Sequence, residues 1–195
     1  MLMGFRGKME LVRAAWGCGE NVGTLANDKL ATDLITRLCQ GNKRFIDVGA
    51  HIGSVVSGVL GRDGTIRCIA VEAIPDKARH LRQKFPTVEV HECAVGESEG
   101  EVSFFINMRQ SGYSSLSRPR EIDGKAFVEI RVPMKRLDSV VEAEGIDAIK
   151  IDVEGHEAAV LAGGRVTLSA SERKAVLIET NESGARFGCS DEMLV

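Results

Sequence analysis

The fold of this 195-residue chain is decided by the stretch Phe45-Ile46-Asp47-Val48-Gly49-Ala50-His51-Ile52-Gly53. Its apolar first half is typical of a buried strand. Gly49 and Gly53 allow the backbone to turn sharply into a helix and to approach a ligand closely. Glu72 ends the next apolar run, at about the offset where an acid binds the ribose hydroxyls in a nucleotide-binding βαβ unit. The stretch therefore predicts a nucleotide-type ligand at the end of the first strand.

The chemistry of this turn narrows the choice of nucleotide. His51 stands where the dinucleotide fingerprint G-x-G-x-x-G requires its second glycine, and the G-K-[ST] triplet of a phosphate loop does not follow Gly53. A carboxylate at Asp47 would repel a pyrophosphate but attract an ammonium group and, at longer range, a sulfonium. S-adenosylmethionine carries both cations and no phosphate, so we expect it as the cofactor. The alternative is an ordinary strand-to-helix turn of an α/β protein.

The composition is that of one globular α/β domain, with 44% hydrophobic and 27% charged residues. The net charge of −3 provides no general basic field, so we expect no nucleic-acid partner. Four basic residues of one predicted helix are interpreted as a solvated face: Lys77, Arg79, Arg82 and Lys84.

The five cysteines are scattered and form no C-x-x-C pair, which does not favour a zinc site. Cys39 and Cys68 fall in apolar patterns and are predicted to be buried free thiols, as suits a reducing cytosol. The sequence shows neither the apolar stretch of a signal peptide nor that of a membrane span. We therefore expect a cytoplasmic protein without an integral membrane segment.

Apolar runs alternate with helical patterns along the middle of the chain. This alternation predicts an α/β fold, a Rossmann-like doubly wound and mostly parallel sheet. Strands are expected at about 44–48, 66–72, 88–92, 148–153 and 175–179, with helices at about 53–60, 75–85 and 157–162. An earlier helix from Asp28 should pack beside the turn through one face, made of Leu30, Leu34, Ile35 and Leu38. The predicted organisation is an N-terminal helical segment (1–42), a cofactor-binding core (43–182) and a polar tail (183–195).

An inserted β-hairpin interrupts this rhythm after the third strand, with strands at 102–106 and 127–132. The long loop between them is expected to be functional. Its residues Tyr113, Ser114 and Ser115 are candidates for binding a substrate, with Tyr113 covering the site. An exposed edge of this hairpin could also pair across a homodimer.

A second cluster of ionisable residues follows the predicted fourth parallel strand. In open α/β sheets the ligand crevice lies at the carboxyl ends of the strands. Lys150 and Asp152 both lie within an apolar run, where buried charges need partners. Because both point to the same face, each can pair with the other only after a local twist. The cluster comprises Lys150, Asp152, Glu154, His156 and Glu157.

With these motifs in this order, the chain resembles the FkbM-type S-adenosylmethionine-dependent methyltransferases over about residues 43–180. The resemblance implies a cofactor bound along the carboxyl edge of the sheet, and O-methylation of a hydroxyl on a sugar, glycolipid or polyketide-type acceptor. The matching stretches are Asp47–Gly53, Val71-Glu72-Ala73, Ala94-Val95-Gly96, Ser114-Ser115-Leu116, Leu137-Asp138 and Ile149–Glu157.

The resemblance also assigns site residues. Those of the turn, Asp47, Gly49, Ala50, His51 and Gly53, would line the methionine part of the cofactor. Glu72 and Ala73 would hold the ribose, and Glu92, Cys93 and Ala94 would flank the adenine. Asp152 and Glu154 would face the methyl group and the substrate, with Lys150 on the substrate side.

Two features depart from the family pattern. His51 stands where such proteins often carry a small amide, and it either simply fits or touches the cofactor. Residues 181–195 hardly provide the antiparallel hairpin that usually ends the sheet. The far edge of the sheet and part of the substrate wall are therefore the least defined parts.

Methyl transfer to a hydroxyl is helped by a base, which typically contributes ~10²–10⁴-fold. His156, Asp152 and Glu154 are the candidates. Alternatively, the two acids together with Glu179 could hold magnesium; we favour catalysis without a metal. The rival interpretations are an NAD-dependent oxidoreductase, a non-catalytic interaction module with this fold, and N-methylation of an amine.

Overall fold

The protein was analysed as a computed structural model, which describes residues 22–39, 41, 43–119, 126–141, 145–170, 175–180 and 183–187. Its centre is a five-stranded sheet in which all neighbouring strands are parallel. Counted along the sheet, the order is β3-β2-β1-β7-β8, which is the Rossmann-like, doubly wound arrangement that the sequence predicts. The strands are β1 (Arg44–Val48), β2 (Arg67–Glu72), β3 (Glu89–Glu92), β7 (Ile146–Ile151) and β8 (Ala175–Ile178).

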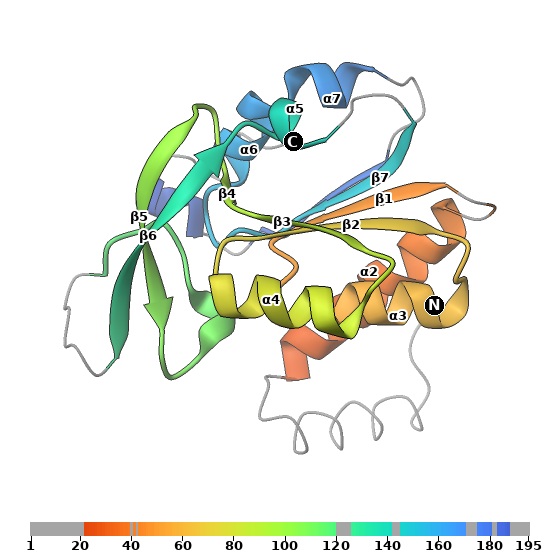
Figure 1. The fold of residues 1–195 in the computed structure, drawn as a ribbon, viewed down its shortest axis with the longest axis horizontal. Helices are drawn as coiled ribbons and strands as arrows, with labels where there is room; N and C mark the ends of the chain where they lie inside the picture. The colour runs from red at the N-terminus through yellow and green to blue at the C-terminus, as the bar shows by residue number, and fades with distance from the viewer. Residues whose placement is uncertain are drawn as a thin grey trace.

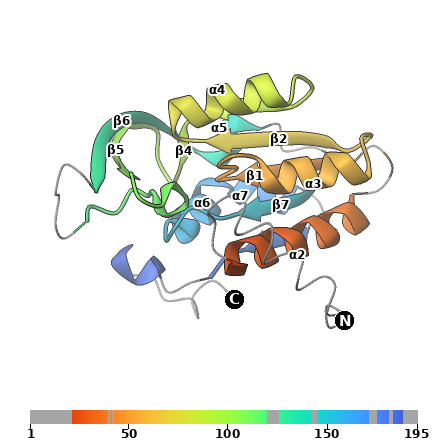
Figure 2. The ribbon, with the colours of Figure 1, turned by 90° about the horizontal axis from the view of Figure 1, so that it is seen from below.

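Helices cover both faces of this sheet. Figure 1 shows α2 (Val22–Leu38), α3 (Ser54–Arg62) and α4 (Pro75–Lys84) below it, and α5 (Leu137–Val140), α6 (Glu157–Gly163) and α7 (Arg165–Ser169) above it. Figure 2, which views the molecule from below, shows α2 and α3 side by side. Successive strand residues enter opposite cores because side chains alternate along a strand. Phe45 packs with the lower layer, and Ile46 with the upper one.

Helix α2 begins at Val22, earlier than the predicted start at Asp28. The predicted buried face is wrong in part. Ile35 is buried, but the leucines expected beside it are turned outward, with Leu30 59% exposed. The inward stripe is Ala31, Ile35 and Cys39, next to the buried Thr32. Thr32 lies against Gly58 of α3, where a Cβ atom would come within 2.7 Å of it. This close approach sets which side of α2 faces the core.

A second, three-stranded sheet stands beside the carboxyl edge of the first (Figure 1). Strands β5 (Gly100–Asn107) and β6 (Phe127–Lys135) are antiparallel and confirm the inserted hairpin. The short β4 (Ala94–Val95), which the sequence did not predict, pairs parallel to β6. The 3-10 turn η1 (Ser111–Tyr113) follows β5. Ser115 forms a bridge to Phe105 that covers part of the outer edge of β5. Pairing of a dimer through this edge stays a prediction.

Cys39, Cys68 and Cys93 are buried free thiols, which confirms the prediction for the first two. Burial raises the pKa of each thiol, to about 11 for Cys39 and Cys93 and about 12 for Cys68.

In the predicted polar tail (183–195), the part that the structure describes is the 3-10 turn η2 (Ser183–Phe187). The expected organisation of residues 1–21 and 188–195 lies outside the described residues.

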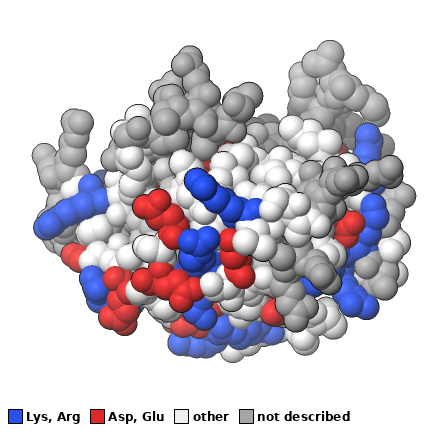
Figure 3. All heavy atoms as spheres, turned by 90° about the horizontal axis from the view of Figure 1, so that it is seen from above, with Lys and Arg blue, Asp and Glu red and all other residues white. Residues whose placement is uncertain are grey.

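No helix among the described residues combines the length and the apolar composition that a bilayer span requires. On the face seen in Figure 3, acidic and basic side chains are interspersed over the described residues. Such a mixed surface matches the small net charge of the sequence.

Candidate functional site

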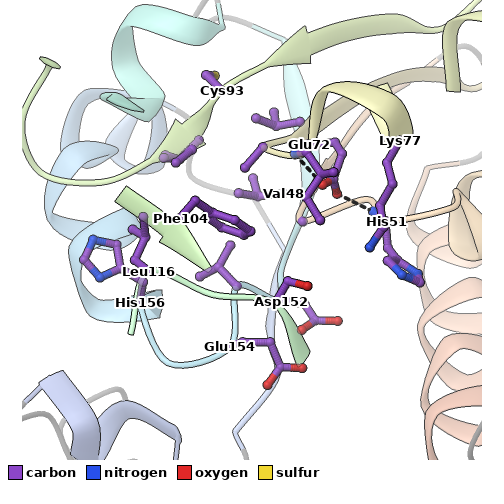
Figure 4. A pocket seen from close by; sticks show the side chains of 18 of the residues that line it. Val48, His51, Glu72, Lys77, Cys93, Phe104, Leu116, Asp152, Glu154 and His156 are labelled. Carbon is purple, nitrogen blue, oxygen red and sulfur yellow. Dashed lines mark hydrogen bonds between the residues drawn. The ribbon is translucent and has the colours of Figure 1, made fainter. Parts of the chain in front are cut away.

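A crevice opens where the carboxyl ends of β1, β2 and β7 meet β4 and η1, and it encloses about 570 Å³, part of it open to solvent. Figure 4 shows its side chains converging from these elements. Parallel sheets place their ligand sites at this edge. Of the predicted site residues, ten line the crevice: Gly49, His51, Glu72, Ala73, Cys93, Ala94, Ser114, Asp152, Glu154 and His156.

The turn after β1 forms one wall of the crevice, and it requires glycine at position 49. Gly49 has a φ of +84°, and a Cβ atom there would lie 1.8 Å from the carbonyl oxygen of Asp152. The N–H groups of Gly49 and Ala50 both donate to the carbonyl of Val71, at 2.9 and 3.0 Å. The turn is therefore fixed to β2 on one side and touches the end of β7 on the other.

Glu72 is held at the end of β2 by two backbone hydrogen bonds. Its Oε2 accepts from the N–H of His51 and its Oε1 from the N–H of Ile74, both at 2.8 Å (Figure 4). Burial raises the pKa of this carboxyl, although both N–H groups oppose the shift. Each carboxylate oxygen has a second lone pair. The arrangement can therefore accept hydrogen bonds from two hydroxyls of a ligand.

Below the crevice, Lys150 joins two carboxyl groups. Its Nζ lies 2.8 Å from Oδ2 of Asp152 and 3.7 Å from Oδ1 of Asp47. Burial would lower the pKa of Lys150, but the two acids outweigh it and raise that pKa. Burial raises the pKa of Asp47, and the ammonium opposes this shift. Asp47 is 1% exposed, and its Oδ1 has no hydrogen-bond partner among the described residues. Lys150 thus pairs with Asp152, which the sequence analysis allowed only after a local twist; Asp152 lies just past the end of β7.

Asp152 has a further partner in Glu179, which follows β8. The N–H of Glu179 donates to the carbonyl of Ile151 at 3.0 Å, which places Glu179 beside Asp152 just past the paired ends of β7 and β8. Burial, followed by contact with Asp152, raises the pKa of Glu179 to about 7. Burial alone would raise the pKa of Asp152, but Lys150 and the neighbouring Glu179 lower it. The sequence analysis considered Glu179 only as a possible magnesium ligand.

The loop after β7 aims side chains into the crevice. Glu154 adopts a left-handed backbone conformation, with a φ of +54°. The buried Glu157 fixes the loop, because its Oε1 accepts the N–H groups of Val153 and Gly155, both at 3.1 Å. Glu157 is therefore a structural residue, whereas Glu154 lines the crevice.

His156 lies apart from Asp152 in Figure 4. Its ring meets that of Phe187 edge-on, with 5.0 Å between centroids, and its buried Nδ1 has no hydrogen-bond partner among the described residues. Burial lowers its pKa, and Glu97 opposes the shift. The ring is therefore neutral at neutral pH and retains a nitrogen that can accept a proton.

The η1 segment is tied to the turn after β1 and to α4. The Ser111 carbonyl accepts a hydrogen bond from Nζ of Lys77 at 2.9 Å, and the Ser111 hydroxyl lies 3.0 Å from Nε2 of His51. Burial, followed by the nearby Lys77, lowers the pKa of His51 to about 4. Within the segment, the Ser114 hydroxyl donates a hydrogen bond to the Ser111 carbonyl at 2.8 Å. Tyr113 is 44% exposed and does not line the crevice.

Among the described residues, no group of three or more histidine, cysteine and acidic side chains is arranged to hold a metal ion. The Asp152 carboxylate binds the Lys150 ammonium instead. Magnesium therefore has no support here, and we assign no metal ligand.

Comparison with known proteins places the chain in a family. The sequence model described as the methyltransferase FkbM domain matches residues 47–194. The chain belongs to this family. No curated protein matches it.

Two solved structures are similar to parts of this FkbM domain. DesVI of Streptomyces venezuelae has 16% identity and a TM-score of 0.30, over 47% of this chain and 36% of that one. Coclaurine N-methyltransferase, solved with N-methylheliamine and SAH, has 19% identity and a TM-score of 0.28, over 33% and 21%. The chain thus spans about a third or less of their length, and these scores support no residue-by-residue comparison.

Seven predicted site residues of the FkbM domain do not line the crevice. Asp47 and Lys150 lie beneath it, Ser115 is buried in its bridge to β5, and Glu92 forms a 2.8 Å ion pair with Arg82. The others are Ala50, Gly53 and Tyr113.

The crevice also contains residues that the sequence analysis missed as site residues. Lys77 was counted among the basic residues of a solvated face. It lies in the first turn of α4, the helix that follows β2, and is therefore close to the carboxyl edge of the large sheet. Phe104 belongs to the apolar run Phe104–Ile106 of β5, in which no alternation with polar residues marks the side that faces the crevice. Further apolar lining comes from Val48, Val71, Ile74, Val95, Leu116 and Val153.

Proposed function

We propose that this FkbM-family chain transfers a methyl group from S-adenosylmethionine to a hydroxyl of a sugar, glycolipid or polyketide-type acceptor. One observation carries the proposal. A single crevice has the Glu72 carboxylate, with free lone pairs, on one side and the Asp152 carboxylate, backed by Lys150, on the other (Figure 4). A ligand with a ribose diol and a nearby cation matches both groups.

The residues present fit this cofactor. Glu72 would hold the ribose hydroxyls, and the apolar wall of Cys93, Ala94 and Phe104 would accept the adenine. The Oδ1 of Asp47 accepts no hydrogen bond among the described residues and has only the Lys150 ammonium beside it, at 3.7 Å below the turn, where the methionine end would lie. When bound, the cofactor supplies a methyl group on a positively charged sulfur, which is a good leaving group.

The chain must then orient the acceptor, exclude water and remove a proton. The η1 segment, fastened by Ser111 to His51 and Lys77, narrows access to the crevice. Asp152, Glu154 and His156 are the proposed proton acceptors. His156 is neutral at neutral pH and retains a free nitrogen, whereas the two acids lie on the side of the crevice that holds Lys150.

N-methylation of an amine is a second candidate, and one observation favours it. The carboxyl groups of Asp152, Glu154 and Glu179 lie near one another on the side of the crevice proposed for the acceptor. A cluster of three acids attracts cationic amines. An oxidoreductase that uses NAD is less favoured, because the Asp47 carboxyl lies below the turn where a pyrophosphate would bind.

A transfer assay tests the proposal. The purified chain is incubated with S-adenosylmethionine carrying a labelled methyl group and with matched panels of hydroxylated sugars and amines. Incorporation into a hydroxyl, lost in Asp152→Asn, supports the proposal. Incorporation into amines alone supports the second candidate. A chelator should leave turnover unchanged, since no metal site is assigned.

A further inference from the structure

One side of α2 carries three leucines that belong to no core cluster of the described residues. Leu30 is 59% exposed, Leu34 39% and Leu38 42%, and they follow one another at intervals of four residues. At about 3.6 residues per turn, this spacing places them in one line along the helix, the leucine stripe. Single exposed leucines need no explanation, whereas a contiguous apolar stripe marks an interaction site.

The leucine stripe lies on the side of α2 that faces away from α3. Thr32 packs against Gly58 of α3, and Leu30 is about 160° from Thr32 around the helix. Asn27, on the same side as the stripe, donates to Oε1 of Glu179 just beyond β8 at 3.4 Å. The stripe therefore runs along the outer border of the lower helical layer, where α3 does not reach it.

The sequence immediately before α2 has a matching pattern. Five of its apolar residues recur at alternating intervals of three and four residues: Leu2, Phe5, Met9, Val12 and Trp16. That spacing is the repeat of helices that pack side by side, and the charged residues of the segment all fall outside this set. Residues 1–21 lie outside the part of the chain that the structure describes, and the pattern is one of sequence alone.

The connection to α2 has the length of a helical hairpin loop. Five residues, 17–21, separate Trp16 from the start of α2 at Val22, and two of them are glycines. Antiparallel helices are commonly joined by loops of about 2–5 residues. Residues equally distant from such a loop lie opposite one another. Three apolar pairs then match, each within about half a helical turn: Met9 with Leu30, Phe5 with Leu34, and Leu2 with Leu38.

We propose that residues 2–16 form a helix that packs antiparallel to α2 on the leucine stripe. Gly4 and Gly7 lower the intrinsic helix propensity of this segment, and an isolated helix of about 15 residues is only marginally stable in water. The segment therefore depends on cover for its apolar side, as the stripe does. The contact extends the lower layer beyond α2 and is independent of the methyl-transfer reaction.

Hydrogen exchange of the full chain, followed by mass spectrometry, tests the contact directly. Amides within residues 2–16 should exchange at least about tenfold more slowly than those of an unstructured chain. Leu34→Lys places a charge in the contact and should remove this protection. Val166→Lys is the matched control, because Val166 is also 59% exposed on a helix, α7, on the other face of the sheet. Protection of β1 and β7 in the same experiment shows that each variant is folded.

Thermal melts give a second measure that does not depend on the lysine variants. Leu34→Ala should lower the Tm by about 2–6 °C, and Val166→Ala by less than about 2 °C. Phe5→Ala should cause a loss similar to that of Leu34→Ala. In the double variant these two losses should not add, because each change removes the same contact, whereas those of Phe5→Ala and Val166→Ala should add.

The alternative occupants give different results. Rapid exchange throughout residues 2–16, protection that survives in Leu34→Lys, or additive losses for Phe5→Ala and Leu34→Ala would overturn the inference. Protection that rises with protein concentration would assign the stripe to a second copy of the chain, and protection that requires vesicles of anionic phospholipid would assign the segment to a membrane surface. Both results would also overturn it. S-adenosylmethionine binding is measured separately, so the proposed function stands or fails on its own.

Discussion

The backbone N–H of His51 donates a 2.8 Å hydrogen bond to Glu72, so the turn after β1 and the end of β2 act as one unit. The backbone of His51 is left-handed, with a φ of +53°, and this conformation directs its N–H at the carboxylate. The same carboxylate is the group proposed to bind the ribose. Positioning of the ligand and the geometry of the turn are thus coupled through one side chain.

Replacement of Glu72 by Gln should test this coupling. The amide keeps one acceptor oxygen but loses the charge and one of the two backbone hydrogen bonds, which costs about 1–3 kcal/mol for a buried donor left unpaired. We expect at least a tenfold loss of S-adenosylmethionine affinity and a lower unfolding temperature. Calorimetric titration and a thermal melt measure both. Unchanged affinity in a folded variant would exclude Glu72 as the ribose ligand.

Gly49→Ala should disrupt the site sterically. The new methyl group would collide with the Asp152 carbonyl, and the φ of +84° disfavours any side chain. We expect a loss of roughly 3 kcal/mol or more in the free energy of unfolding. Gly61→Ala is the matched control, because Gly61 lies in α3 with nothing within 4 Å of the added atom. That change should stabilise the chain by about 0.5–1 kcal/mol, as helical alanine does. Equal effects in urea denaturation would contradict this account.

Four strands of the large sheet could be predicted because each is a largely apolar run ended by a polar or turn residue, whereas β3, with two glutamates and a histidine, shows only the alternation of Val88 and Val90 with polar residues. The inward side of α2 could not, because Leu30 and Ala31 begin adjacent stripes with the same spacing. The contact between Thr32 and Gly58, which selects one stripe, joins two helices. Strand β4 has only two residues, too few for any periodic pattern.

The site was predictable to a similar degree. The ends of β1, β2 and β7 could be brought together from the sequence, because parallel strands end at one edge. Lys77 and Phe104 enter the crevice only through the placement of α4 and the second sheet. The position of Glu179 beside Asp152 depends on the contact between the ends of β7 and β8, which no local pattern reveals.

Lys150→Met should be strongly destabilising, because it leaves two carboxyl groups in the interior without their cation. Removal of one partner from a buried ion pair typically costs about 3–5 kcal/mol. Loss of the ammonium raises the folded-state pKa of Asp152 above the unfolded value and that of Asp47, which is already raised, still further. The deficit is therefore smallest at low pH and grows as pH rises from the unfolded values towards the raised ones. Urea denaturation at about pH 5 and about pH 8 measures the difference. A deficit independent of pH would show that the pairing has no electrostatic role.

Tyr113→Ala should separate cofactor binding from acceptor binding. The ring is half-exposed and lies outside the crevice lining, so S-adenosylmethionine affinity should change by less than about twofold. The KM for the acceptor should rise, because the ring is proposed to cover the acceptor. Steady-state kinetics with an acceptor from the transfer assay tests this. Equal weakening of both ligands would contradict the proposed cover.

The central claim is that the crevice binds S-adenosylmethionine, and titration calorimetry of the purified chain tests it most directly. The ligands are S-adenosylmethionine, S-adenosylhomocysteine and NAD, with Asp47→Ala as the control variant. The account predicts binding of the first two in the micromolar range, weakened in the variant, and no binding of NAD. Preferential binding of NAD, or no binding of any ligand by the folded chain, would contradict it.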